Sequence, residues 1–121
     1  MKHISQAYLL RVFIGECDKY KGRPLSEAIL EKARKRGMAG ATVLRGIMGF
    51  GAGGKIHTAK ILRLSEDLPI VVEIVDTQER IEGFIPELDV MVKEGLVTLE
   101  NIQVTAYRGR GKNRWEGELV E

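Results

Sequence analysis

The sequence contains few cysteine, histidine or aromatic residues. Among its 121 residues are one cysteine, Cys17, two histidines and 6% aromatic residues. A single cysteine excludes an intrachain disulfide and any metal cluster built on cysteine. Because the neighbouring charges of Glu16 and Asp18 disfavour the thiolate, we expect the pKa of Cys17 to be raised and the thiol to be unreactive. No group of His, Asp and Glu has metal-ligand spacing either, so we expect no bound metal.

A strong net charge and long hydrophobic runs are also missing. The formal net charge is +2 with both signs mixed along the chain, which argues against a surface potential strong enough to attract nucleic acid or a membrane. The apolar runs are too short to span a bilayer, and the first residues lead into no signal-peptide pattern. We therefore expect a cytoplasmic protein. A content of 44% hydrophobic and 30% charged residues is typical of one globular domain, here over 1–121.

Hydrophobic patterning predicts the element order β-α-β-β-α-β. Strands are expected at 8–15, 41–47, 69–75 and 96–107, partly extended chain at 60–64, and the first helix at 24–36. An apolar stripe from Ile81 to Val92 predicts a second helix that Asp76 caps and that Pro86 kinks or restarts. The apolar run of the third strand predicts burial on both of its faces. This order predicts an α+β, ferredoxin-like fold, a four-stranded mainly antiparallel sheet with two helices on one face.

Glycine is concentrated in one stretch of the chain. Seven of the fourteen glycines lie between Gly37 and Gly54, although glycine loses the most backbone freedom on folding. Such a stretch has two uses, as a mobile loop or as a backbone cradle whose N–H groups bind a phosphate. Four glycines supply candidate N–H groups for an anion site: Gly49, Gly51, Gly53 and Gly54.

Basic residues lie near this stretch and again after the last predicted strand. Arg45, Lys55 and Arg63 are close to the glycines in sequence, and the segment 108–112 forms a second basic loop. Guanidinium groups suit bidentate contacts to phosphate. The stretch lacks the G-x-x-x-x-G-K-[ST] pattern of a P-loop, however, and no helix is predicted after it. From composition alone, a plain flexible loop and a phosphate site are equally open.

No catalytic arrangement is evident. Nucleophilic catalysis requires a nucleophile, a base and an orienting acid within reach of one another. The serines have no base at a recognisable spacing, and the two histidines are His3 near the terminus and His57 in the glycine stretch. We interpret His57 as a solvated loop residue or a ligand contact, assign no catalytic residue, and expect the protein not to be an enzyme.

These residues resemble the PII signalling proteins. The similarity lies in the second predicted strand, the glycine stretch and the third strand, and the Arg108-x-Arg110 motif resembles the PII C-loop. A longer pattern, from about Leu9 to Tyr107, is closer to the short PII-like proteins of unknown function. Its residues are Gly15-Glu16, Pro24-Leu25, Ala39-Gly40-Ala41-Thr42-Val43, Arg45-Gly46, Gly49-Phe50-Gly51, His57-Thr58, Leu64-Ser65 and Asp67-Leu68-Pro69.

The resemblance implies an assembly, a ligand and a mode of action. PII proteins are ferredoxin-like homotrimers with little or no catalysis. Clefts between their subunits bind adenine nucleotides, and a T-loop, here about 46–60, then docks onto a target protein such as a membrane transporter or an enzyme. By position, Arg108 and Arg110, in the basic tail 108–121, would reach the phosphates. The full candidate binding set is Thr42, Arg45, Gly46, Gly49, Phe50, Gly51, Lys55, His57, Arg63, Arg108 and Arg110.

The sequence departs from the PII pattern before the last strand. The glycine- and lysine-rich phosphate loop of PII proteins is replaced by the segment 92–96, which contains Glu94. Fewer donors and one adverse charge favour AMP or ADP over ATP as the bound nucleotide. The T-loop segment also lacks tyrosine, so the resemblance does not support uridylylation of the PII kind. We therefore expect an AMP- or ADP-responsive homotrimer that acts through its loop on a target protein.

Three other functions are compatible with this fold. A trimeric metal-tolerance protein is one, but two histidines and one cysteine give it few ligands for a metal. An RNA-recognition module would stack bases on aromatic residues of its central strands, but Phe50 lies in the glycine stretch instead. A small phosphate-processing enzyme would pair an arginine and an asparagine with a phosphate loop, but Asn101 lies in a predicted strand and Asn113 in the tail, without a paired base. Neither nucleic-acid binding nor membrane insertion is expected.

Overall fold

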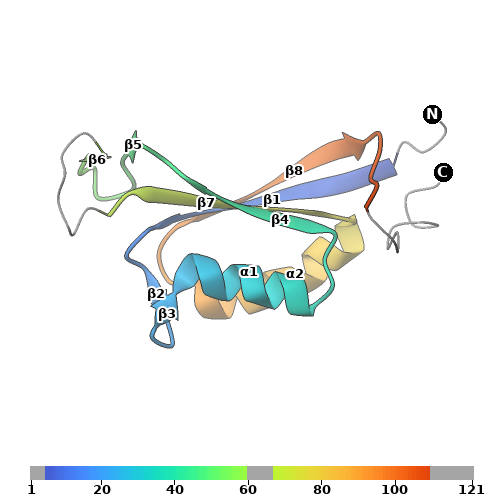
Figure 1. Ribbon diagram of the computed structural model, residues 1–121, viewed down its shortest axis with the longest axis horizontal. Helices are drawn as coiled ribbons and strands as arrows, with labels where there is room; N and C mark the ends of the chain where they lie inside the picture. Colours follow the sequence, from blue (N-terminus) through green and yellow to red (C-terminus); the bar gives the residue numbers. More distant parts are fainter. Residues whose placement is uncertain (1–4, 60–66, 110–121) are drawn as a thin grey trace.

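A computed structural model of the chain describes residues 5–59 and 67–109 and confirms the α+β fold (Figure 1). Two helices lie on one side of a four-stranded antiparallel sheet, and two short hairpins lie at one end of it. The sheet contains β1 (Ser5–Gly15), β4 (Gly40–Arg45), β7 (Pro69–Asp76) and β8 (Leu96–Val104). The helices are α1 (Leu25–Lys35) and α2 (Gln78–Met91). The hairpins pair β2 (Lys19–Tyr20) with β3 (Arg23–Pro24) and β5 (Met48–Gly49) with β6 (His57–Thr58).

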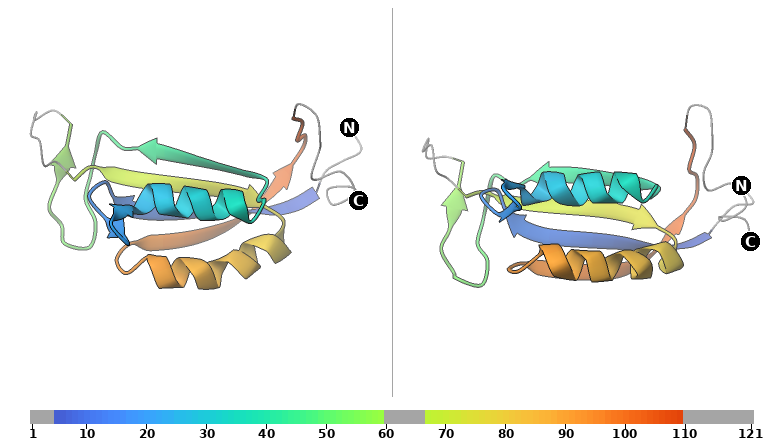
Figure 2. Two further views of the ribbon diagram at one scale, coloured as in Figure 1. Left: turned by 60° about the horizontal axis from the view of Figure 1, so that its bottom comes forward. Right: turned by 90° about the horizontal axis from the view of Figure 1, so that it is seen from below.

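The strand order is β4-β7-β1-β8, and every neighbouring pair is antiparallel. Figure 2 shows α1 and α2 side by side across one face, while the opposite face bears no helix. This topology groups the connections of the chain at the two ends of the sheet. The segments 16–24, 46–59 and 92–95 lie at what we call the hairpin end, and the segments 36–39, 76–77 and 105–109 lie at the opposite end (Figures 1 and 2).

Alternation along the two central strands builds the core. In β7 every second residue is buried, and the register places three of these four opposite a buried residue of β1. The pairs are Ile14 with Ile70, Val12 with Val72 and Leu10 with Ile74. Ile29 of α1 and Phe84 of α2, both fully buried, pack against them. The predicted burial of this strand on both faces is wrong, because Val71 and Val75 lie half-buried on the face that no helix covers.

The uncovered face has an apolar row beside a polar one. Directly paired residues of an antiparallel sheet point to the same face, so the register aligns Leu44, Val71, Phe13 and Leu96 across all four strands. The adjacent row is Thr42, Glu73, Arg11 and Thr98. The Arg11 guanidinium donates to Glu73 at 2.9 Å and to Glu100 at 3.0 Å. The hydrogen bond to Glu73 is the main cause of a raised pKa for Arg11.

The helix α2 begins one residue later than its predicted cap. The Thr77 hydroxyl accepts the N–H of Arg80 at 3.4 Å, so Thr77 is the N-cap and the prediction of Asp76 is wrong. The Asp76 side chain is fully buried and accepts two other N–H groups instead, from Thr77 at 2.7 Å and from Ala39 at 3.0 Å. Asp76 therefore joins the end of β7 to the segment that precedes β4.

Other features also differ from the prediction. The strand β1 begins at Ser5 and β4 ends at Arg45, against the predicted 8 and 47. The helix α2 continues through Pro86, so the predicted restart is wrong. Pro86 and Glu82 are both exposed, so water can satisfy the Glu82 carbonyl that lacks a helical donor. The strand β8 ends at Val104, short of the predicted 107. The partly extended chain predicted at 60–64 lies outside the described residues.

Replacing Asp76 with alanine should destabilise the fold by about 2 kcal/mol, because the N–H of Ala39 loses its acceptor inside the protein. Urea unfolding followed by circular dichroism measures the change. Thr77→Ala is the matched control, since it removes only the helix cap and should cost about 1 kcal/mol. An Asp76→Ala variant no less stable than Thr77→Ala would contradict the bridging role.

Candidate functional site

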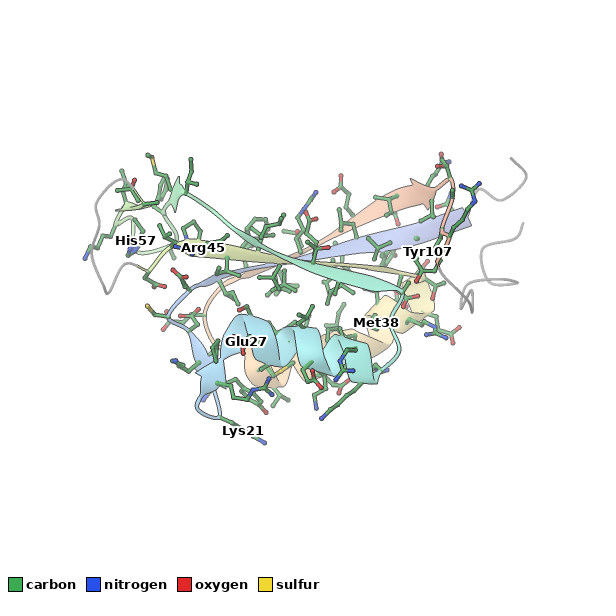
Figure 3. All side chains as sticks on the ribbon, in the orientation of Figure 1. Lys21, Glu27, Met38, Arg45, His57 and Tyr107 are labelled. Atoms are coloured by element: carbon green, nitrogen blue, oxygen red, sulfur yellow. The ribbon has the colours of Figure 1, made fainter. Side chains whose placement is uncertain are left out.

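The glycine-rich stretch forms a hairpin that extends from the end of β4 (Figures 1 and 3). In β5 and β6, Gly49 pairs with His57 and Met48 pairs with Thr58, and the N–H of Ala59 donates to Ile47 at 2.8 Å. The tip closes in a turn in which the N–H of Gly54 donates to the Gly51 carbonyl at 2.9 Å. Gly54 has a φ of 76°, which favours glycine at this position.

Pro69 accounts for two of the glycines at the base of this hairpin. The N–H of Gly46 donates to the Pro69 carbonyl at 2.7 Å. A Cβ atom would lie 2.8 Å from Pro69 Cγ at Gly46 and 3.1 Å from it at Gly49, so the proline ring occupies the space of a side chain. Gly51, Gly53 and Gly54 have open space around the corresponding position. Packing against Pro69 therefore explains the glycines at the base of the hairpin. It does not explain those at the tip, which remain candidates for the predicted anion site.

An ion pair that the sequence did not reveal lies beside the base of the hairpin. The Glu16 carboxylate is 3.3 Å from Arg45 Nε, which joins the connection after β1 to the last residue of β4. The N–H of Glu16 donates to the Leu68 carbonyl at 2.8 Å, and the N–H of Cys17 donates to the Asp67 carboxylate at 2.8 Å. Gly15-Glu16 belongs to the pattern of the resemblance, but no spacing in the sequence relates Glu16 to Arg45.

Cys17 lies in this same acidic environment. Partial desolvation, followed by the nearby carboxylates of Asp67, Glu16 and Asp18, raises the pKa of its thiol. The direction agrees with the prediction from the neighbouring charges. A raised pKa leaves less of the reactive thiolate at neutral pH, so the exposed thiol has no activated character.

The hairpin presents apolar side chains to solvent. Ile47, Phe50 and Ile56 are exposed by 76%, 71% and 63%. Lys55 is exposed between them and forms no ion pair with the described residues, whereas His57 is half-buried. The hairpin therefore offers contact area for an aromatic base or for another protein, together with the charge of Lys55.

The connection between α2 and β8 reaches the same end of the sheet. Gly95 has a φ of 148°, and a Cβ atom there would lie 2.5 Å from the Phe13 carbonyl oxygen. Its backbone therefore runs against the end of β1, next to the segment that carries Glu16. Lys93 and Glu94 are exposed in this connection, so the acid that departs from the PII pattern lies at the hairpin end.

Arg108 lies at the opposite end of the sheet. The hydroxyl of Tyr107 donates to the Ala39 carbonyl at 2.6 Å, which ties the segment after β8 to the residue before β4. Figure 3 shows Tyr107 at one end of the molecule and Arg45 and His57 at the other. The intervening strand β4, Gly40–Arg45, is about 20 Å long at 3.3 Å per residue. One chain therefore does not bring Arg108 near its own hairpin.

The other predicted site residues fall into three groups. Arg45, Gly46, Gly49, Phe50, Gly51, Lys55 and His57 lie together at the hairpin end. Thr42 is exposed in the middle of β4, where it pairs with Glu73 on the uncovered face. Arg63 and Arg110 lie outside the described residues.

Residues 5–59 and 67–109 contain neither a metal-binding group nor a membrane-spanning helix. No group of three or more His, Cys, Asp or Glu side chains in these ranges is placed to hold a metal ion. No helix among the same residues is long and apolar enough to cross a membrane.

Residues 7–104 match the model of the family DUF190, described as "Uncharacterized ACR, COG1993". A "UPF0166 protein" of Aquifex aeolicus (strain VF5) is 42% identical over 96 residues, which cover 79% of this chain and 90% of that relative. The "UPF0166 protein MJ1524" of Methanocaldococcus jannaschii is 34% identical over 105 residues, which cover 86% of this chain and 94% of that relative.

Solved structures of similar fold come from CPII, a nitrogen regulatory PII-like protein of Thiomonas intermedia K12. One, bound to ADP, AMP and bicarbonate, has a TM-score of 0.60 and 19% identity, covering 88% of this chain and 94% of that one. A second, bound to ADP and bicarbonate, has a TM-score of 0.56 and 19% identity, covering 88% and 95%. At this identity the likeness establishes the fold.

Replacing Gly46 with alanine should destabilise the protein by about 1–3 kcal/mol, because the new methyl group overlaps the ring of Pro69. Gly51→Ala is the matched control. Nothing surrounds that position and its φ is not in the left-handed region, so the change should stay within about 0.5 kcal/mol. Thermal unfolding compares the two, and equal losses of stability would show that the packing against Pro69 is not the reason for Gly46.

Proposed function

The chain belongs to the DUF190 family, and from this premise we propose that it is a PII-like regulatory protein that binds an adenine nucleotide, AMP or ADP in preference to ATP. The nucleotide is a bound effector rather than a substrate, and no metal is required. Support comes from the fold neighbours, whose structures contain ADP and AMP, and from the hairpin that extends from β4.

The observation that carries this proposal is the separation of the two basic parts of the candidate site. Arg45 and Lys55 lie at the hairpin end, and Arg108 is held at the opposite end by the hydrogen bond between Tyr107 and Ala39. Both can contact one nucleotide only if two copies of the chain supply them. The resemblance to PII proteins implies a homotrimer, and we propose one in which the hairpin of one copy and Arg108 of its neighbour form each site.

The uncovered face of the sheet supports such an assembly. Leu44 and Leu96 are exposed by 47% and 57% at the two ends of its apolar row. Burying a row of this kind against another copy removes apolar surface from water. The neighbouring ion cluster of Arg11, Glu73 and Glu100 occupies the place where an RNA-recognition module would need aromatic residues, so the RNA-binding alternative is not favoured.

Charge at the hairpin end supports a nucleotide with few phosphates. Glu16 pairs with Arg45 at this end of the sheet, where Lys55, Lys93 and Glu94 also lie. Repulsion between carboxylates and phosphate increases with the number of phosphates. AMP and ADP therefore fit this end of the molecule better than ATP.

The exposed hairpin supports action on a partner protein. Ile47, Phe50 and Ile56 are largely solvent-exposed, and aromatic and aliphatic anchors of this kind supply much of the affinity of protein interfaces. We propose that nucleotide binding at the base of the hairpin changes how this apolar tip is presented to a target, such as a membrane transporter or an enzyme.

Calorimetric titration with AMP, ADP, ATP and cyclic AMP tests the ligand. AMP and ADP should bind at least about tenfold more tightly than ATP, the equivalent of one charge-assisted hydrogen bond. Titrations with and without bicarbonate test whether a co-ligand found in CPII also acts here. If none of the four nucleotides binds at millimolar concentration, with or without bicarbonate, the proposed function is wrong.

Mixing two variants tests whether the site lies between copies. Arg45→Gln and Arg108→Gln should each weaken nucleotide binding by about 1.5–3 kcal/mol, whereas Arg34→Gln, on the outer surface of α1, should not. Coexpression of the two weakened variants should restore one intact site in each mixed trimer, measured by titration after purification with two different tags. If mixing restores no binding, a site shared between neighbours is rejected.

A further inference from the structure

Glu16 is held firmly at the base of the hairpin. Its N–H donates to the carbonyl of Leu68, a buried residue, at 2.8 Å, and the next N–H, of Cys17, donates to the Asp67 carboxylate at 2.8 Å. Gly15 allows this approach, because a Cβ atom there would lie 2.6 Å from Asp67 Oδ1. The backbone that carries Glu16 is therefore tied to the chain entering β7, and its carboxylate has a defined place.

That place is next to the guanidinium of Arg45. The two groups are 3.3 Å apart, and Arg45 forms no other ion pair with the described residues. The Arg45 side chain is 61% exposed, so donors of its guanidinium remain available to a ligand. An anion that binds Arg45 must therefore share the guanidinium with Glu16 or displace the carboxylate.

We propose that Glu16 is a specificity-determining residue of the nucleotide site, which selects ligands of low charge through its contact with Arg45. This inference rests on the proposed function. A phosphate that approaches Arg45 meets the negative charge of Glu16, and the repulsion grows with the charge of the phosphate chain. The pair is solvent-exposed and therefore weak. It lowers the affinity for ATP more than that for AMP, without closing the site to either.

The first test is the nucleotide preference of Glu16→Gln, a variant that keeps the shape of the side chain. By calorimetry its affinity for ATP should rise about fivefold and its affinity for AMP no more than about twofold, which narrows the preference for AMP. Glu27→Gln is the matched control. Glu27 is an exposed carboxylate at the start of α1, without an ion pair among the described residues (Figure 3), and its replacement should leave the preference unchanged.

The second test asks whether the effect passes through Arg45. In an Arg45→Gln background, the additional change Glu16→Gln should shift the ratio of ATP to AMP affinity less than it does in the wild type, because Arg45 no longer holds the phosphate beside Glu16. A shift of the same size in both backgrounds, or an equal shift in Glu27→Gln, would overturn the inference.

A third measurement needs no nucleotide. Phenylglyoxal should modify Arg45 faster in Glu16→Gln than in the wild type or in Glu27→Gln, as followed by mass spectrometry of the Arg45 peptide. If the rates are equal, Glu16 does not restrain Arg45 and the inference is wrong. If neither the wild type nor Glu16→Gln binds any nucleotide, the proposed function fails and the specificity role falls with it. If the wild type binds nucleotide and Glu16→Gln leaves the preference unchanged, the inference alone fails.

Discussion

The backbone ladder of β7 with its neighbours β4 and β1 is the constraint on which the rest of the structure depends. At one end of β7, the Pro69 carbonyl holds Gly46 and the preceding Leu68 carbonyl holds Glu16. At the other end, Asp76 holds the N–H of Ala39. Both halves of the candidate site are thus positioned by the two ends of one strand. A shift of its register by one residue would exchange its buried and uncovered faces and break these contacts together.

Much of the fold could be predicted from the sequence because its signals are local. The run of β-forming residues in β1 and the apolar stripes of the two helices depend on neighbouring residues, and the element order then leaves few compact arrangements. The errors concern features that depend on distant parts of the chain. Val71 and Val75 are apolar on a face without helices, so composition alone overstated their burial. Asp76 resembles a helix cap in the sequence, but its buried carboxylate accepts the N–H of Ala39, and Thr77 caps the helix instead.

The sequence predicts which segment of the chain forms the candidate site, but not which residues contact one another there. The glycine-rich segment and its basic neighbours are visible in the sequence, but the reason for Gly46 and Gly49 is the ring of Pro69, on another strand. The contact between Glu16 and Arg45 exists only because β1 and β4 both end beside the start of β7. Sequence likewise gives no indication that Tyr107 keeps Arg108 about one strand length from the hairpin.

The hydrogen bond between Gly46 and the Pro69 carbonyl also allows the loop to change in sequence and length while the sheet stays the same. It fastens the chain that leaves β4 to the chain that enters β7, so the fold of the sheet does not depend on how many residues lie between them. The entropy of closing such a loop rises only with the logarithm of its length, about 0.6 kcal/mol for each doubling. Insertions, deletions and new recognition sequences can therefore accumulate there at small energetic cost, and related proteins can acquire different targets on an unchanged scaffold.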